Sequence, residues 1–183
     1  MKKLFVVFLF LVGLCISATA QDFKPLRLDG GLGLGIPFTK GFDAGVLFYL
    51  EPKYEIVPRQ IAVGVRWEGS LFAGKNAEGS SFSAKTSFGY MATGDYYFGN
   101  KSFRPFAGLG LGAFKVNAGE ASTDNTGKVN FGTNFATMLR TGFDLSHFRL
   151  TASYNHAFAK GGAFNFFGIT AGFYIGGGKK NNH

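Results

Sequence analysis

The chain has almost no cysteine, little charge, and no long apolar run beyond its first residues. Cys15 is the only cysteine, so no disulfide can form within the chain. Charged residues make up 16% of it, against about 25% in average globular proteins. After residue 20, no apolar run approaches the ~20 residues that a membrane-spanning helix needs. A disulfide scaffold and membrane-spanning helices are therefore both excluded.

Glycine and phenylalanine are abundant instead, with 28 and 23 residues. Glycine is at about twice its average usage of ~7%. The formal net charge of +8 would suit an acidic partner. The lysines form no cluster, however, and many fall in expected loops or the tail: Lys40, Lys75, Lys101, Lys128, Lys160, Lys179 and Lys180. Nucleic acid is therefore not expected as a partner.

The first twenty residues have the pattern of a secretory signal. Two lysines precede an apolar run over 4–16, and small residues then lead to a cleavage site after Ala20. We therefore predict a signal peptide over 1–20 and a single exported domain over 21–183. Cys15 lies inside the signal and follows a bulky leucine, which argues against a lipoprotein.

The rest of the chain alternates between apolar and small or polar residues with the period of two typical of β-strands. In the clearest stretch, 104–114, proline, alanine and leucine share one face, while glycine, Arg104 and two phenylalanines share the other. Eight such stretches are predicted as strands: 26–36, 42–51, 60–73, 84–98, 104–114, 130–143, 148–157 and 164–175. The second can run on to Tyr54, and Pro52 and Pro58 are expected to bracket the connection after it. An even number of ~10-residue alternating segments predicts an all-β fold, an eight-stranded antiparallel up-and-down transmembrane β-barrel.

The composition of the two faces distinguishes a membrane barrel from a soluble one. A soluble eight-stranded barrel points its apolar face inward and carries charge outside. Here the non-apolar face is rich in glycine, serine and threonine and poor in charge, which suits a narrow lumen, so we expect the apolar face to contact lipid. Two aromatic girdles are expected at the rims. One comprises Tyr96, Phe98, Phe103, Phe143, Phe148 and Phe173, and the other Phe42, Phe72, Phe131 and Phe164.

Several charged residues fall on the face assigned to the lumen: Arg27, Asp29, Arg66, Glu68, Lys85, Asp95, Arg104, Arg140 and Arg149. Buried charges are tolerated only when they are paired. We therefore predict a salt-bridged network that plugs the lumen, the alternative being an ion path. Arg66, Arg104 and Arg140 are expected to reach three acids, Glu68, Asp95 or Asp29.

No catalytic residue, cofactor or metal site is predicted. The segment 108–113 matches the pattern G-x-G-x-x-A, but it continues a strand, whereas dinucleotide binding needs a helix after these glycines. Ser153 and His156 fall on opposite faces of one strand, with no acid placed to orient the imidazole. His147 lies in a turn and His183 in the tail, and neither belongs to a set of metal ligands.

Four segments resemble the small OmpA/OmpX-type outer-membrane barrels, and most of all the outer-membrane β-barrel domain family of Bacteroidota type: 50–54 (LEPKY), 62–68 (AVGVRWE), 93–98 (TGDYYF) and 103–108 (FRPFAG). The resemblance covers the whole expected mature chain. It implies a place in the outer membrane of a Gram-negative cell envelope, contact with outer-membrane lipid, and insertion by the barrel-assembly machinery. It departs from many such proteins in that the last aromatic strand is followed by a polar tail.

The expected role is structural or adhesive rather than enzymatic. Contact with an extracellular ligand would use the longer connections 74–83, 117–129 and 158–163. Two alternatives stay open, a lipid-modifying barrel enzyme and a porin-like channel for small solutes.

Overall fold

The computed structural model of the protein describes residues 24–38, 43–75, 82–99, 102–120, 128–158 and 164–177. The expected signal segment, 1–20, lies outside these residues.

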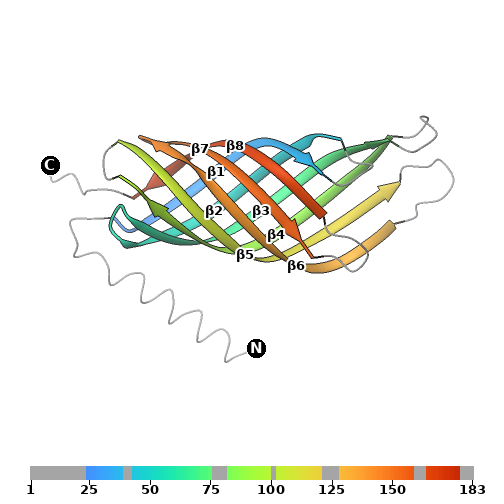
Figure 1. Ribbon diagram of the computed structural model, residues 1–183, viewed down its shortest axis with the longest axis horizontal. Coiled ribbons are helices and arrows are strands. Elements are labelled where there is room, and N and C mark those ends of the chain that lie inside the picture. Colours follow the sequence, from blue (N-terminus) through green and yellow to red (C-terminus); the bar gives the residue numbers. More distant parts are fainter. Residues whose placement is uncertain are drawn as a thin grey trace, which may run out of the picture.

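Eight strands form one closed barrel. They are β1 (Leu26–Pro37), β2 (Gly45–Val57), β3 (Ile61–Lys75), β4 (Phe82–Tyr97), β5 (Phe103–Glu120), β6 (Lys128–Leu145), β7 (Phe148–Ala157) and β8 (Phe164–Gly176). Each strand pairs antiparallel with its neighbours in sequence, and β1 pairs with β8 to close the sheet. The strands cross the long axis of the barrel obliquely (Figure 1), as closure requires. The predicted eight-stranded antiparallel up-and-down β-barrel is confirmed.

The two ends of the barrel differ. We call one the turn end, because short connections join β2 to β3, β4 to β5 and β6 to β7 there. Two non-glycine residues with positive φ, Arg59 at 62° and Ser146 at 54°, make two of these turns tight. The end of β8 also lies here, at the left of Figure 1. We call the opposite end the loop end.

Several strands are longer than predicted, and two loop predictions were partly wrong. β3 continues to Lys75 and β4 begins at Phe82, so the expected loop 74–83 is strand at both of its edges. The same holds for 117–129, because β5 reaches Glu120 and β6 starts at Lys128. In both hairpins the backbone ladder continues into sequence with weak strand preference, because each strand finds a partner across the hairpin.

The alternation of faces is as predicted for most of the described side chains. Outward leucines and aromatics are strongly exposed, such as Leu32 at 65% and Phe173 at 68%. The inward residues between them are buried, so the core lies inside the barrel. Among the described residues, no helix is long and apolar enough to span a membrane.

Inward glycines leave room for large lumen side chains. A Cβ on Gly31 would lie 2.8 Å from the Cα of Gly172 and 2.8 Å from Cε1 of Tyr49. Ordinary side chains do not approach this closely, so the glycine leaves room for the Tyr49 ring of the adjacent strand β2.

Candidate functional site

The turn-end half of the lumen holds a cluster of buried charges, which we call the lumen charge network. Its cations are Arg27, Lys53, Arg66, Arg104, Arg140 and Arg149, and its acids are Asp29, Glu51, Glu55, Glu68, Asp95 and Asp144. Every member is at most 6% exposed. The formal charges of these twelve residues sum to zero, and β1 to β7 each supply at least one member.

Asp95 on β4 lies at the centre of the network. Its carboxylate is 2.6 Å from Lys53 Nζ and 2.7 Å from Arg140 Nε. Arg149 Nη2 contacts it as well, at 2.9 Å. A single acid on one strand therefore joins cations from β2, β6 and β7.

Glu51 on β2 forms a second junction. Arg140 donates to it at 2.7 Å, and Arg66 Nη1 lies at 3.2 Å. The Thr93 hydroxyl also donates to Glu51, at 2.6 Å. Both carboxylate oxygens therefore have donors, which buried charge requires.

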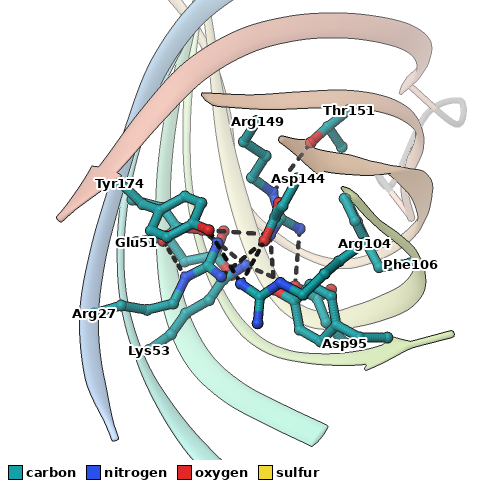
Figure 2. A network of polar contacts seen from close by, with 12 residues as sticks. Arg27, Glu51, Lys53, Asp95, Arg104, Phe106, Asp144, Arg149, Thr151 and Tyr174 are labelled. Atoms are coloured by element: carbon teal, nitrogen blue, oxygen red, sulfur yellow. Dashed lines mark hydrogen bonds and ion pairs between the residues drawn. The ribbon is translucent and has the colours of Figure 1, made fainter. Parts of the chain in front are cut away.

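Asp144 is the junction nearest the turn end, and Figure 2 shows it surrounded by guanidinium groups. Arg27 Nη1 lies 2.8 Å from its carboxylate, Arg104 Nη2 3.2 Å and Arg149 Nη1 3.3 Å. Arg27 also pairs with Asp29 at 2.6 Å, and so connects two acids.

Aromatic rings cover the guanidinium planes. The Arg27 guanidinium carbon is 3.8 Å from the centre of the Tyr174 ring, and that of Arg149 is 3.7 Å from the Phe106 ring. Arg66 lies over Tyr49 at 3.8 Å. Arginine suits this environment because its planar cation stacks on rings while its edge still donates hydrogen bonds.

Among the described side chains, the loop-end half of the lumen is mainly apolar, with Asn134 and Asn155 as buried polar exceptions. After a layer in which the hydroxyls of Ser70 and Ser87 bond to each other, a buried apolar cluster begins. It comprises Leu47, Phe72, Met91, Phe114, Ala136, Met138, Ala157, Phe164 and Phe166. The Phe72 ring packs edge-on against Phe164 and Phe166, with centroids 5.6 and 5.5 Å away.

These positions correct the second expected aromatic girdle. Phe72 and Phe164 point into the lumen, with exposures of 1% and 5%, because they share the inward parity of their strands. The Phe42 residue and the Phe131 side chain lie outside the described part of the chain. At the turn end, the outer aromatics pair as Tyr96 with Phe98, Phe103 with Phe143, and Phe148 with Phe173.

The structure brings most of the predicted lumen charges together, with partners that differ in part. Arg66 pairs with Glu68 at 2.6 Å, and Arg140 pairs with Asp95. Arg104 does not reach any of the three expected acids. It lies 3.2 Å from Asp144 and 3.6 Å from Glu55. The side chain of Lys85 is outside the described part.

Four members were missing from the predicted network: Glu51, Lys53, Glu55 and Asp144. Glu51 falls within the predicted strand 42–51 but was not counted among the lumen charges. Lys53 and Glu55 were left out of the predicted network because Pro52 was expected to lie in a connection. In the structure, β2 continues through Pro52 to Val57. The period of two from Tyr49 to Glu55 was the signal that could have placed them.

The described histidines have no catalytic partners. Ser153 is buried in the lumen, while His156 points outward and packs on Phe158, with ring centres 4.2 Å apart. His147 lies beside the Tyr174 ring at 5.6 Å. The tail histidine, His183, lies outside the described residues. Within those residues, no group of three or more metal-binding side chains is placed to hold an ion.

Comparison with known proteins identifies relatives by fold only. No protein-family model matches the chain, and no curated protein matches it significantly. The crystal structure of Ail, the attachment invasion locus protein of Yersinia pestis, in complex with the heparin analogue sucrose octasulfate, is 14% identical. The match covers 85% of this chain and 100% of that one, with a TM-score of 0.63.

Two further solved structures have the same architecture. Neisserial surface protein A is 14% identical over 85% of this chain and 97% of its own, with a TM-score of 0.54. The outer-membrane enzyme PagL is 14% identical over 81% of this chain and 99% of its own, with a TM-score of 0.50. The fold is therefore that of the small outer-membrane barrels of OmpA/OmpX type.

Proposed function

We propose that the protein is an integral outer-membrane barrel with a structural or adhesive role, whose lumen is sealed by its own side chains. The observation that carries this proposal is the inversion of polarity across the wall. Large apolar side chains cover the outside, while the charged side chains of the lumen charge network lie inside. An apolar surface that surrounds the whole barrel far exceeds the patches that soluble monomers expose, but it suits hydrocarbon.

The exposed aromatic residues and the lengths of the connections together suggest how the barrel would be oriented in the membrane. Tyr96 and Phe98 are 44% and 66% exposed close to the turn end, where rings prefer the membrane–water interface. Membrane barrels have short periplasmic turns and longer outer connections. The turn end would therefore face the periplasm and the loop end the exterior.

The lumen charge network supports a sealed barrel rather than a channel. Its charges balance and are nearly inaccessible to solvent, so an ion would have to displace paired groups in a low dielectric. The apolar cluster of the loop-end half is a second barrier, because moving an ion past buried apolar side chains is costly. Planar-bilayer recordings test this point, and steady large openings would refute it.

The remaining parts of the proposal concern export and partners. Residues 1–20 would direct secretion, the barrel-assembly machinery would insert the domain 21–183, and outer-membrane lipid would surround it. The resemblance to the Bacteroidota-type barrel family supports membership of that group as part of the proposal. An extracellular partner would contact the segments 74–83, 117–129 and 158–163 at the loop end, as befits a barrel whose fold relatives include an attachment protein.

Membrane fractionation tests the main proposal. The full chain, expressed in a Gram-negative host, should appear in the outer-membrane fraction, require detergent for extraction, and migrate faster on gels when unheated. A freely soluble periplasmic monomer would overturn it.

The enzyme alternative has its own assay. Ser153→Ala and His156→Ala variants should leave lipid A unchanged relative to the wild-type chain. A lipid A modification that is lost in either variant would refute the non-enzymatic role.

A further inference from the structure

The charges left over outside the lumen are unevenly distributed. With the twelve network residues paired, the described side chains include four other formal charges: Lys24, Asp43, Arg59 and Lys115. Asp43 and Lys115 lie toward the loop end, whereas Lys24 and Arg59 lie at the turn end. The surplus charge described at the turn end is therefore purely positive.

A cavity of about 240 Å³ opens at this end, beside Arg59. The turn between β2 and β3, the start of β5, the turn between β6 and β7, and the end of β8 converge around it. Its lining is Arg59, Ser102, Arg104, Ser146, His147, Tyr174, Gly176 and Gly177. This lining includes two arginines and two serines but no acidic residue, and the Glu55 carboxylate lies just behind it, 3.6 Å from Arg104 Nη1.

Arg59 has unused donor capacity at the edge of this cavity. Its backbone N–H donates to Glu55 at 2.7 Å, which holds the positive-φ turn in place. Its guanidinium makes no ion pair with any described residue, and its Nε is covered from solvent without a hydrogen-bond partner. Nε is closed to an outside ligand, but Arg59 is only half-buried and its two terminal nitrogens make no hydrogen bond with a described residue, so they can donate to an acceptor from outside.

Arg104 is the second cation of the cavity. Its Nη2 is occupied by Asp144 at 3.2 Å and by the Tyr174 hydroxyl at 3.1 Å. Its Nη1 lies 3.6 Å from the nearest carboxylate, that of Glu55, which is longer than a hydrogen bond. One edge of this guanidinium is therefore also available.

We propose that this cavity binds a phosphate group. Donors reach it from three separate turns, and a tetrahedral oxyanion can accept from all of them, whereas one arginine fork would already satisfy a planar carboxylate. One water occupies ~30 Å³ of liquid. The cavity is therefore large enough for a phosphate group together with some of its water.

The phosphate can come from solution or from a phospholipid headgroup. A second cavity, of about 390 Å³, lies on another side of Arg59 and is lined in part by the exposed rings of Tyr96 and Phe98. These rings mark the interface where headgroups lie, if the barrel is in the membrane as proposed above. The phosphate site itself does not depend on that assignment.

The test uses the full chain refolded in a neutral detergent, with folding verified by the heat-dependent gel shift. Backbone amide shifts are followed by NMR during three titrations. The probes are inorganic phosphate, dihexanoyl phosphatidylglycerol, and dihexanoylglycerol, which lacks the phosphate. We expect saturable shifts around Arg59 and Ser146 with at least one phosphate-bearing probe and none with dihexanoylglycerol. Binding of both phosphate probes identifies a general phosphate site, and binding of the phospholipid alone identifies a headgroup site.

The decisive variant is Arg59→Gln, which keeps a non-glycine residue in the positive-φ turn but removes the guanidinium. Loss of a charge-assisted hydrogen bond should weaken binding about tenfold or more. Lys24→Gln is the matched control, since it removes one positive charge from the same end without lining the cavity, and it should stay within about twofold. No saturable binding of either phosphate probe, or equal weakening in the two variants, would overturn the proposal. A normal gel shift in such an experiment would leave the barrel assignment intact.

Discussion

Asp95→Asn is the sharpest test of the lumen charge network. The substitution keeps the shape of the side chain but removes the negative charge that Lys53, Arg140 and Arg149 contact within 2.9 Å. The network then carries one uncompensated positive charge in a region closed to solvent. Breaking a buried ion pair by removing one partner typically costs 3–5 kcal/mol.

The remaining contacts decide where in that range the cost falls. Arg140 keeps Glu51 at 2.7 Å, and Lys53 keeps Asp29 at 3.0 Å. Arg149 keeps longer contacts with its remaining acids, 3.3 Å to Asp144 and 3.4 Å to Asp29. Two of the three cations thus retain a close partner, so we expect about 3 kcal/mol rather than 5.

Urea unfolding of the refolded barrel in lipid vesicles measures this cost. The urea concentration at the midpoint should fall, while the slope of the unfolding free energy against urea concentration stays unchanged. Asp43→Asn serves as the control, because it removes an exposed acid outside the lumen and should change stability by no more than about 0.5 kcal/mol. The double variant Asp95→Asn with Arg149→Gln restores neutrality and should cost less than the sum of its single changes. A cost for Asp95→Asn as small as that of the control would mean that water screens the network, and the sealed lumen would be wrong.

Three further predictions address the wall and the apolar half of the lumen. Leu109→Arg should destabilise the barrel by roughly 2–4 kcal/mol, because Leu109 is 55% exposed near the middle of β5 and an arginine there would face lipid. A neutral effect on unfolding in vesicles would mean that this face does not contact lipid. Gly110→Leu should cost roughly 1–3 kcal/mol by overpacking, since a Cβ at this position would already lie 3.0 Å from Met138 Cε; an unchanged midpoint would indicate an unfilled lumen. Phe72→Ala should cost roughly 3–5 kcal/mol, as expected for a ring in a packed core. The exposed ring of Phe98, changed to alanine, should cost clearly less, and equal losses would contradict the inward position of Phe72.

The faces of the strands could be predicted from the sequence because they depend on a local rule. A residue and its second neighbour lie on the same side of a strand, so the pattern of Arg104 to Phe114 assigns every side chain without knowledge of the partners. The assignment failed where this rule was set aside. Phe72 follows Ser70 and Glu68 in inward parity, yet it was placed at the rim because it lies near the end of a strand.

Strand ends were harder to predict because they depend on neighbouring strands. Pro52 lacks an N–H and was read as a break, but the ladder to β1 runs through it, with Leu28 as its partner. Asp144 was read as a turn residue, whereas Leu145 pairs with Phe148 and only two residues make the turn. A closed barrel supplies two partners to every strand, so one weak residue does not end it.

Ion pairs such as that of Arg140 with Glu51 could not be predicted, because they join strands that are not neighbours in the sheet. Arg140 on β6 reaches Glu51 on β2 across the lumen, a contact that depends on the width and stagger of the closed barrel. This geometry also explains how the domain folds without a disulfide. The backbone ladder joins each strand to its two neighbours, while the charge network joins strands on opposite walls. Weakening the network should therefore loosen the turn-end half of the barrel, while the aromatic cluster around Phe72 and Phe166 still holds the loop-end half.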